Sequence, residues 1–516
     1  MRKIESSFLY VGIVVVLLPL LLMRDFTPLN ELRYLSIAEE ALRNHVFFAF
    51  TNHGVPYADK PPLYLWIVML CRYLVGSHCM WLLSLASLLP AMGVLLVMNG
   101  WTAQELDREH RLLAQTMLCS TGLFLVTAVV LRMDMLMTFF IVLSLRYFWK
   151  LYTAEGNGCT NGLLFPVFVF LAIFSKGPMG LLIPLCSSTV FLVATGRIRN
   201  FGHYWGWRTW GILGGCCLLW FAAVYAEGGT GYLYNLLFHQ TFGRAVNAFK
   251  HASPFYFYAL CLWYCLAPWC LLFVGTLCMA LRPGFVRSEL QCLFLCVAVS
   301  TLVLLSCFSS KLPVYMLPAV PFIVYAVAMF LPRFQQKWWL RLSLALPALL
   351  FMAVLPCLFL VVRQGRWAWL DRPEMYVGAT ILSMTGFGAV SLLCRRGRSV
   401  DSPRVVRRMA CGLLVSLFAV SWSLPWLNAR IGYGAMCSRA LEISHAKGIS
   451  EYRSWHLSRP ENMDVYLHSP VKAIANEDSL AAEPRPFLLL TRRGQTGCFK
   501  GQDSHVVGAY AVVVFP

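Results

Sequence analysis

Polar residues that could bind a phosphate and move a proton occur in short stretches between long apolar runs. Three carboxylates are candidate bases, namely Glu31, Asp59 and Asp134, and Asp59 is also a candidate metal ligand. Cations and hydrogen-bonding side chains accompany them, namely Asn30, Arg33, Tyr34, Lys60, Lys176, Arg244, Ser310 and Lys311. Positioned cations stabilise negative charge that develops on a leaving group, and a carboxylate can act as a general base. The residue types therefore predict a site for an anionic substrate.

The elements that must position these residues are membrane helices. The 516 residues are 59% hydrophobic and 13% charged, whereas a soluble chain is about one quarter charged. Hydropathy predicts about 13 spans, at 8–23, 78–99, 112–130, 135–153, 163–176, 178–195, 209–226, 254–280, 290–308, 314–332, 339–362, 375–394 and 409–427. The segment 61–76 is apolar but short, which favours a re-entrant or interfacial helix. The first span follows Arg2 and Lys3 without a small-residue cleavage site, which favours a retained anchor over a signal peptide.

Basic residues predict how the chain crosses the membrane. Arginines gather in alternate loops, most densely at 395–408, and basic loops stay cytoplasmic. This places the N-terminus inside, the C-terminus outside, and all the candidate site residues on the outer side. We therefore interpret the net charge of +19 as basic residues that set the membrane topology and bind an anionic lipid substrate, rather than as a sign of nucleic-acid binding. Snorkelling to the membrane surface is the preferred interpretation for Arg132 alone, but it does not explain carboxylates and lysines that converge from five turns.

Two stretches of the first outer loop, residues 24–77, have predictable local structure. Thr27 is expected to cap an interfacial amphipathic helix with Pro28 at its first position, and Asn30, Arg33 and Tyr34 share one face of it. An ordinary amphipathic anchor with solvated charges is the alternative. Lys60 precedes Pro61 and is expected beside a helix N-terminus, a position suited to a phosphate. Asp59 next to it is a candidate metal ligand or base, or the partner in a simple ion pair.

The composition changes after the last span. "PFLLLTRR" and "HVVGAYAVVVF" predict strands and "NEDSLAA" predicts a capped helical turn. We therefore expect a transmembrane domain at 1–427 and a small extracytoplasmic α/β domain at 428–516. The 19 cysteines lack metal-ligand spacing, and Cys437 and Cys498, outside the membrane runs, could pair or stay free.

Six motifs together carry a family resemblance. "NELRY", "YADKPPLYLW", "LRMD", "FSKGP", "FGRAVNAFKHASPFYFY" and "SSKLPVYMLP" occur in an order and spacing that resembles the polyprenyl-phosphate-sugar glycosyltransferases of the family thirty-nine (protein mannosyltransferase-like) type. The closest likeness is to bacterial aminoarabinose–lipid A transferases. The motifs cover residues 8–330, and the span count and tail domain extend the likeness over the whole chain.

The resemblance implies a GT-C-type α-helical polytopic protein of the bacterial inner membrane, with its active site on the periplasmic face. It implies an inverting transferase that moves a sugar from an undecaprenyl-phosphate-type donor to lipid A, or else to a protein or surface glycan. We expect a monomer that binds membrane lipids and no nucleic acid. A transporter or flippase for an anionic lipid is the rival from another class. That rival would use midplane sites and internal repeats, which the sequence does not show.

The first outer loop departs from the family. Relatives of this type carry an Asp-Glu pair where this chain has Asn30 and Glu31, and an amide cannot take a proton. Either another carboxylate acts, with Asp134 expected ahead of Asp59 and Glu31, or the acceptor is an anionic lipid A phosphate that needs little base. His251 matches a family histidine that forms, with Asp59, a sparse site for a divalent cation such as zinc. The alternative is a histidine that hydrogen-bonds to a loop.

Overall fold

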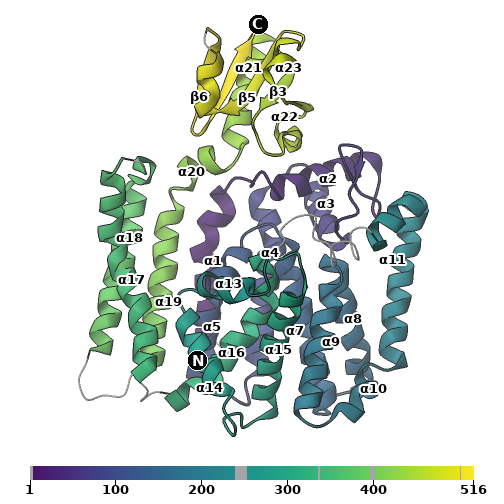
Figure 1. Ribbon diagram of the computed structural model, residues 1–516, viewed down its shortest axis with the longest axis vertical. Helices are drawn as coiled ribbons and strands as arrows, with labels where there is room; N and C mark the ends of the chain where they lie inside the picture. Colours follow the sequence, from purple (N-terminus) through teal and green to yellow (C-terminus); the bar gives the residue numbers. More distant parts are fainter. Residues whose placement is uncertain (1–3, 239–252, 335–337, 366, 395–400, 500) are drawn as a thin grey trace. The chain divides into compact units, whose positions relative to one another are not determined.

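The computed structural model describes residues 4–238, 253–334, 338–365, 367–394, 401–499 and 501–516 (Figure 1). The chain divides into two compact units. The helical unit comprises Met1–Leu17, Ala58–Tyr64 and Ser84–Val420. The sheet unit comprises Leu18–Tyr57, Leu65–Leu83 and Ser421–Pro516. The predicted tail domain is thus part of a unit that also holds most of the predicted first outer loop, residues 24–77.

Long apolar helices dominate the helical unit. Eight helices in the described residues are long and apolar enough to cross a membrane, or up to nine if a bent pair is one span. Their cores are α4 (Met80–Trp101), α7 (Met133–Tyr152), α8 (Gly158–Lys176), α11 (Trp207–Tyr234), α15 (Glu289–Cys307), η3 with α16 (Pro313–Ala319, Val320–Phe330), α17 (Trp338–Arg363) and α18 (Pro373–Leu393). Further helices are α1 (Ile4–Met23), α9 (Met179–Ala194), α10 (Phe201–Tyr204) and α19 (Ser402–Ser421). The helical membrane fold is confirmed, and the count of 13 spans stays a prediction.

Two of the predicted spans are each broken into two helices. The span 112–130 is α5 (Arg108–Cys119) followed by α6 (Gly122–Thr127), and the span 254–280 is α13 (Phe257–Cys265) followed by α14 (Cys270–Ala280). Pro268 lacks the amide that a continuous helix needs. Polar groups at one break form hydrogen bonds with polar groups at the other. The Gly122 amide donates to the Ala267 carbonyl at 2.9 Å, and the Trp269 indole donates to the Ser120 hydroxyl at 3.0 Å. Mean hydropathy over a window of about 19 residues does not detect such a short break, so each pair of helices was predicted as a single span.

The sheet unit contains the predicted strands. The five-stranded sheet has the order β4-β3-β5-β7-β6, with β3 (Tyr452–Trp455) parallel to β4 (Val471–Ile474) and β5 (Phe487–Arg492). β7 (Tyr510–Phe515) runs antiparallel to β5 and to β6 (Asp503–Val507). "PFLLLTRR" is therefore β5 and "HVVGAYAVVVF" is β6 and β7. "NEDSLAA" is the short helix α23 (Glu477–Ala481), whose N-cap Asn476 accepts from the Ser479 amide at 2.8 Å.

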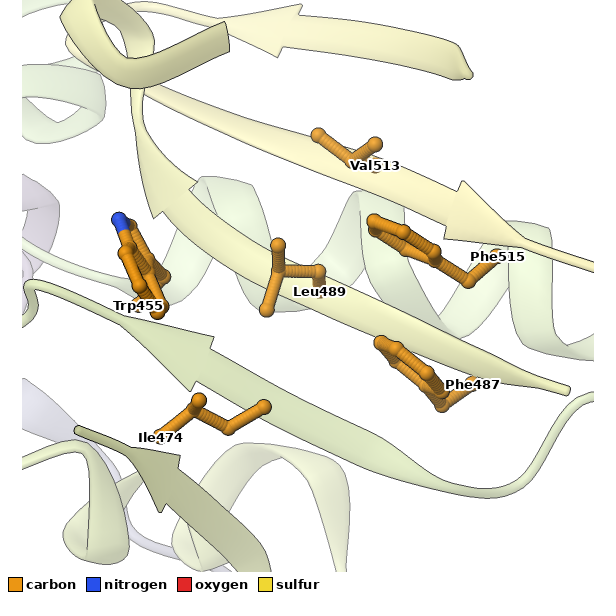
Figure 2. Close-up of a cluster of buried hydrophobic side chains, with 6 residues drawn as sticks. All are labelled: Trp455, Ile474, Phe487, Leu489, Val513 and Phe515. Atoms are coloured by element: carbon orange, nitrogen blue, oxygen red, sulfur yellow. The ribbon is translucent and has the colours of Figure 1, made fainter. Parts of the chain in front are cut away.

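One face of this sheet packs its own apolar core. Trp455, Ile474, Phe487, Leu489, Val513 and Phe515 form the cluster shown in Figure 2. Residues two apart on a strand share a face, which is why Phe487 joins Leu489 and Val513 joins Phe515. The helix α21 (Gly434–Lys447) contacts β5 and β7. β5 is buried on both faces, as its continuous apolar run indicates.

Residues 24–77, the predicted first outer loop, form α2 (Glu31–Asn44), the two-residue strands β1 (Thr51–Asn52) and β2 (Val55–Pro56), and α3 (Leu63–Val75). The prediction that Thr27 caps α2 is wrong, because the helix begins at Glu31 after the N-cap Asn30. Glu31 instead reaches back and accepts a hydrogen bond from the Thr27 amide at 2.7 Å, which favours a turn before the helix. The helix α3 begins two residues after Pro61 rather than at it. Cys437 is buried, Cys498 is exposed, and both are free thiols.

Candidate functional site

The helical unit contains a cavity of about 460 Å³ that collects sequence-predicted site residues from three separate segments. Asp59 and Lys60 line it from the stretch before α3, Lys176 from the end of α8, and Ser310 from the turn before η3. These four were predicted from motifs more than 100 residues apart in the chain. The cavity combines two cations, a carboxylate and a hydroxyl.

Lys176 is placed by the turn that joins α8 to α9. Gly177 has a φ of 103°, a backbone conformation that side-chain-bearing residues rarely adopt. Three residues later, a Cβ on Gly180 would lie 2.3 Å from backbone atoms of Ala172 and Ile173 in α8. The glycines of "FSKGPMG" thus let α9 fold back tightly on α8, and this turn presents the Lys176 ammonium at the cavity.

A buried carboxylate holds this lysine. Asp134, in the first turn of α7, is 1% exposed. One carboxylate oxygen accepts a hydrogen bond from the Lys176 ammonium, and the other accepts one from Arg132 Nε at 3.1 Å. The ammonium also lies 4.3 Å from the centroid of the Tyr315 ring, a cation–π contact. Because both oxygens of Asp134 already bind cations, the geometry suits a residue that orients Lys176 better than a proton acceptor.

Apolar and aromatic side chains form the rest of the cavity wall. Trp220, Phe221, Leu236 and Leu237 line it on the side of α11 and the residues that follow it. Tyr315 adds an aromatic face beside Lys176. Cations next to a hydrophobic wall match a ligand with an anionic head and a hydrocarbon tail.

The α2 residues predicted for the site lie in the sheet unit. Arg33 donates to Asn30 Oδ1 at 3.3 Å and lies 5.3 Å from the centroid of the Tyr57 ring. Glu31 is completely buried and receives two hydrogen bonds from the Arg24 guanidinium, at 2.6 and 2.8 Å. The carboxylate thus accepts a bidentate pair of hydrogen bonds from one guanidinium and a third from the Thr27 amide. This geometry indicates a structural role for Glu31, which fixes the chain at the start of α2. Tyr34 is 5% exposed on the same helix.

Lys311 was predicted to bind substrate, but its ammonium is buried against backbone carbonyls. Its side chain is 4% exposed, and its ammonium donates to the carbonyls of Phe308 and, at 3.0 Å, Ser253. Within the described ranges, the neighbouring Ser310 rather than Lys311 lines the cavity. This lysine thus ties the turn before η3 to the start of the segment that leads to α13.

Arg244 and His251 lie outside the described residues, so the predicted Arg244 contact and the Asp59–His251 metal pair stay predictions. In the part of the chain that the structure covers, no group of three or more His, Cys, Asp or Glu side chains could hold a metal ion.

Two residues of the site were missed by sequence reasoning. Arg132 was interpreted as a snorkelling side chain, but it pairs with Asp134 at 3.1 Å. Tyr315, inside the motif "SSKLPVYMLP", was not singled out although its ring faces Lys176. The "LRMD" spacing, with a cation two residues before a carboxylate, is the signal that could have indicated the Arg132 pair.

No model of a known protein family matches the chain. It is 28% identical over 309 residues to an uncharacterized protein of Aquifex aeolicus, which covers 58% of this chain and 59% of that one. The chain thus spans about three fifths of that relative's length. It is 24% identical over 471 residues, 86% of this chain and 79% of the relative, to undecaprenyl phosphate-alpha-4-amino-4-deoxy-L-arabinose arabinosyl transferase 1 of Pseudomonas fluorescens.

The same likeness appears in the fold. The crystal structure of ArnT from Cupriavidus metallidurans bound to undecaprenyl phosphate matches with a TM-score of 0.75, over 99% of this chain and 97% of that one, at 17% identity. The resemblance to aminoarabinose transferases that the motifs predicted is confirmed, because the matched relative and the matched crystal structure are both proteins of that kind. The chain has the GT-C fold, and it is similar in sequence and structure to the undecaprenyl phosphate-aminoarabinose arabinosyl transferases.

Proposed function

We propose that this protein is an inverting glycosyltransferase of the bacterial inner membrane that takes a sugar from an undecaprenyl-phosphate-linked donor. It works as a monomer with its site on the periplasmic face, and its acceptor is lipid A. The observation that carries the proposal is the cavity of the helical unit, where Lys60 and Lys176 stand beside a hydrophobic wall. Similarity to arabinosyl transferases that use such a donor supports it.

The cavity accounts for both ends of the donor. Its lysines can bind the phosphate and stabilise the charge that grows there as the sugar–oxygen bond breaks. A charge-assisted hydrogen bond contributes roughly 1.5–3 kcal/mol. The isoprenoid chain next to the phosphate would lie against Trp220 and Phe221. Tyr315 and Asp134 hold Lys176 in place, so its ammonium needs little reorganisation when the charge develops.

The state of the carboxylates bears on the acceptor. Glu31 and Asp134 are both buried in ion pairs, which leaves Asp59 as the one of the three predicted carboxylates that lines the cavity. A hydroxyl acceptor would need Asp59 as its base. A phosphate acceptor attacks as an anion and needs none, which agrees with Asn30 in place of the family's aspartate. We therefore assign the lipid A phosphate as acceptor ahead of a protein or glycan hydroxyl.

The test is turnover by the purified protein in detergent. A synthetic undecaprenyl-phosphate sugar is incubated with lipid A, with lipid A lacking its phosphates, and with no acceptor, and released undecaprenyl phosphate is measured. We expect release only with the phosphorylated acceptor. Lys176→Met should lower the rate of release about 10²–10³-fold, whereas Lys150→Met, at the opposite end of α7 from Asp134, should leave it unchanged. Absence of release with every acceptor would refute the proposed function, and equal release with the dephosphorylated lipid would refute the acceptor.

A further inference from the structure

A single helical turn near the C-terminus, α22 (Asp464–Leu467), packs against α2. Two of its side chains hold the chain at two points of the segment 24–57, which we call the α2 segment. All of these residues belong to the sheet unit. The two contacts come from Asp464 and Tyr466, which are only two residues apart.

The first contact holds the middle of α2. Asp464 Oδ2 accepts a hydrogen bond from the Ser36 hydroxyl at 3.2 Å, and Ser36 is 1% exposed. His53 Nε2, in the β1–β2 turn, lies 3.2 Å from the Ser36 hydroxyl and 3.9 Å from Asp464 Oδ2. Glu40 of α2 fixes this turn, because its carboxylate accepts from the backbone amides of His53 at 2.5 Å and Gly54 at 3.0 Å.

Serine, histidine and aspartate are the residues of a nucleophilic triad, but this cluster cannot work as one. In a triad the aspartate and the serine bind opposite ring nitrogens of the histidine. Here Asp464 and Ser36 both approach Nε2 and bond to each other, and the hydroxyl is buried. The arrangement is a tie between α2, the β1–β2 turn and α22.

The second contact holds the chain before α2. The Tyr466 hydroxyl donates to Asp25 Oδ1, and the Gly434 amide donates to Asp25 Oδ2 at 2.8 Å. A Cβ on Gly432 would lie 2.0 Å from the same Oδ2, so only glycine leaves room for the carboxylate. Burial raises the pKa of the Tyr466 phenol well above its ordinary value, which keeps the hydroxyl protonated and able to donate. Asn428 adds a bond from the Asp25 amide at 3.0 Å.

The two contacts bracket the candidate substrate-binding residues of α2. Asp25 lies five residues before Asn30, and Ser36 lies three residues after Arg33. Because α2 buries Glu31 and Tyr34 as well, a shift at either bracket would move the whole segment between them.

We propose that α22 is a clamp, in which Asp464 and Tyr466 are positioning residues that hold Asn30 and Arg33 in the arrangement the transferase needs. The inference rests on the proposed function. Loss of one bracket would lower the fraction of molecules whose α2 segment is competent to bind substrate. The apparent affinity for substrate falls in proportion to that fraction. Saturating substrate shifts the molecules back to the competent conformation. The clamp therefore predicts an effect on KM with little effect on kcat.

The experiment combines hydrogen exchange with kinetics on the full-length protein in detergent. In Tyr466→Phe we expect faster amide exchange at residues 26–37, unchanged exchange in β5 and β7, and a KM for the donor or acceptor that rises roughly tenfold, the worth of one hydrogen bond to a charged group. Tyr433→Phe is the matched control. Its hydroxyl donates to the Ser458 carbonyl at 2.9 Å and accepts from the Ser458 amide at 3.1 Å, both within the tail, so neither quantity should change at α2.

A second pair of variants covers the case in which Tyr466→Phe does not fold. Asp464→Ala should loosen residues 26–37 and raise KM, and Asp464→Asn, which keeps an acceptor for Ser36, should recover part of both. Unchanged exchange at 26–37 would overturn the clamp. Faster exchange there with unchanged KM would overturn its positioning role. A wild-type protein without turnover would instead refute the proposed function, and the exchange result would still show whether α22 holds α2.

Discussion

Replacing Asp134 with asparagine tests whether this carboxylate orients Lys176 or takes a proton itself. Asp134 is 1% exposed and pairs with Lys176 and Arg132. Removal of one partner from a buried ion pair costs about 3–5 kcal/mol because it leaves uncompensated charge. Asp134→Asn should therefore lower the unfolding temperature measurably. With its carboxylate partner gone, Lys176 should leave the cavity, and loss of one positioned electrostatic group costs about 10²–10³-fold in kcat.

A double-mutant cycle separates the two roles. If Asp134 acts through Lys176, then Asp134→Asn combined with Lys176→Met should be no slower than Lys176→Met alone, within about threefold, because both changes remove the same interaction. An independent general base would add its own loss of about 10²–10⁴-fold. The assay is kcat for release of undecaprenyl phosphate at saturating donor. Glu155→Gln, which breaks an exposed pair with Arg146 at 2.8 Å, is the control and should change kcat less than twofold. Multiplicative losses in the cycle would refute the positioning role.

Three further predictions follow from the other charged residues. Lys60→Ala should lower kcat/KM at least tenfold in a protein that still folds. Lys311→Ala should lower the unfolding temperature, since its ammonium satisfies two carbonyls; a larger kinetic loss in Lys311→Ala than in Lys60→Ala would exchange their roles. Glu31→Gln should destabilise the fold by about 3–5 kcal/mol through the buried Arg24 pair, and full stability in a thermal shift assay would contradict that pair. The hydrogen bond from His78, with Arg72, lowers the pKa of Glu39 to about 2. Because the folded-state pKa is depressed, this stabilisation is complete above the ordinary value of 4.5 and is lost as pH falls toward 2. Unfolding temperatures between pH 5 and 2 should fall less steeply in Glu39→Gln, and parallel curves would exclude the effect.

Much of the architecture could be predicted because it depends on local properties of the chain. Apolar runs specify helices that cross a membrane wherever they occur, since unsatisfied backbone groups are too costly in lipid. The strands β5 and β7 are recognisable in the sequence as short continuous apolar runs. Asn476 caps α23 through a hydrogen bond to a residue only three positions away, which is also a local feature. The convergence of Asp59, Lys60, Lys176 and Ser310 was also predicted, because all four lie in short stretches between apolar runs that the basic loops place on one side of the membrane.

What only the tertiary structure decided is which of these charges are already paired. Asp134 meets Lys176 from 42 residues away, and Lys311 meets the Ser253 carbonyl from 58 residues away. No periodicity or spacing reports such a contact, because it depends on how α7, α8 and the turn before η3 pack. The same holds for the matched breaks at Gly122 and Ala267. A carboxylate in a sequence shows that a charge is present, but its chemistry depends on the cations and the burial around it, and those come from segments that meet only in the folded chain.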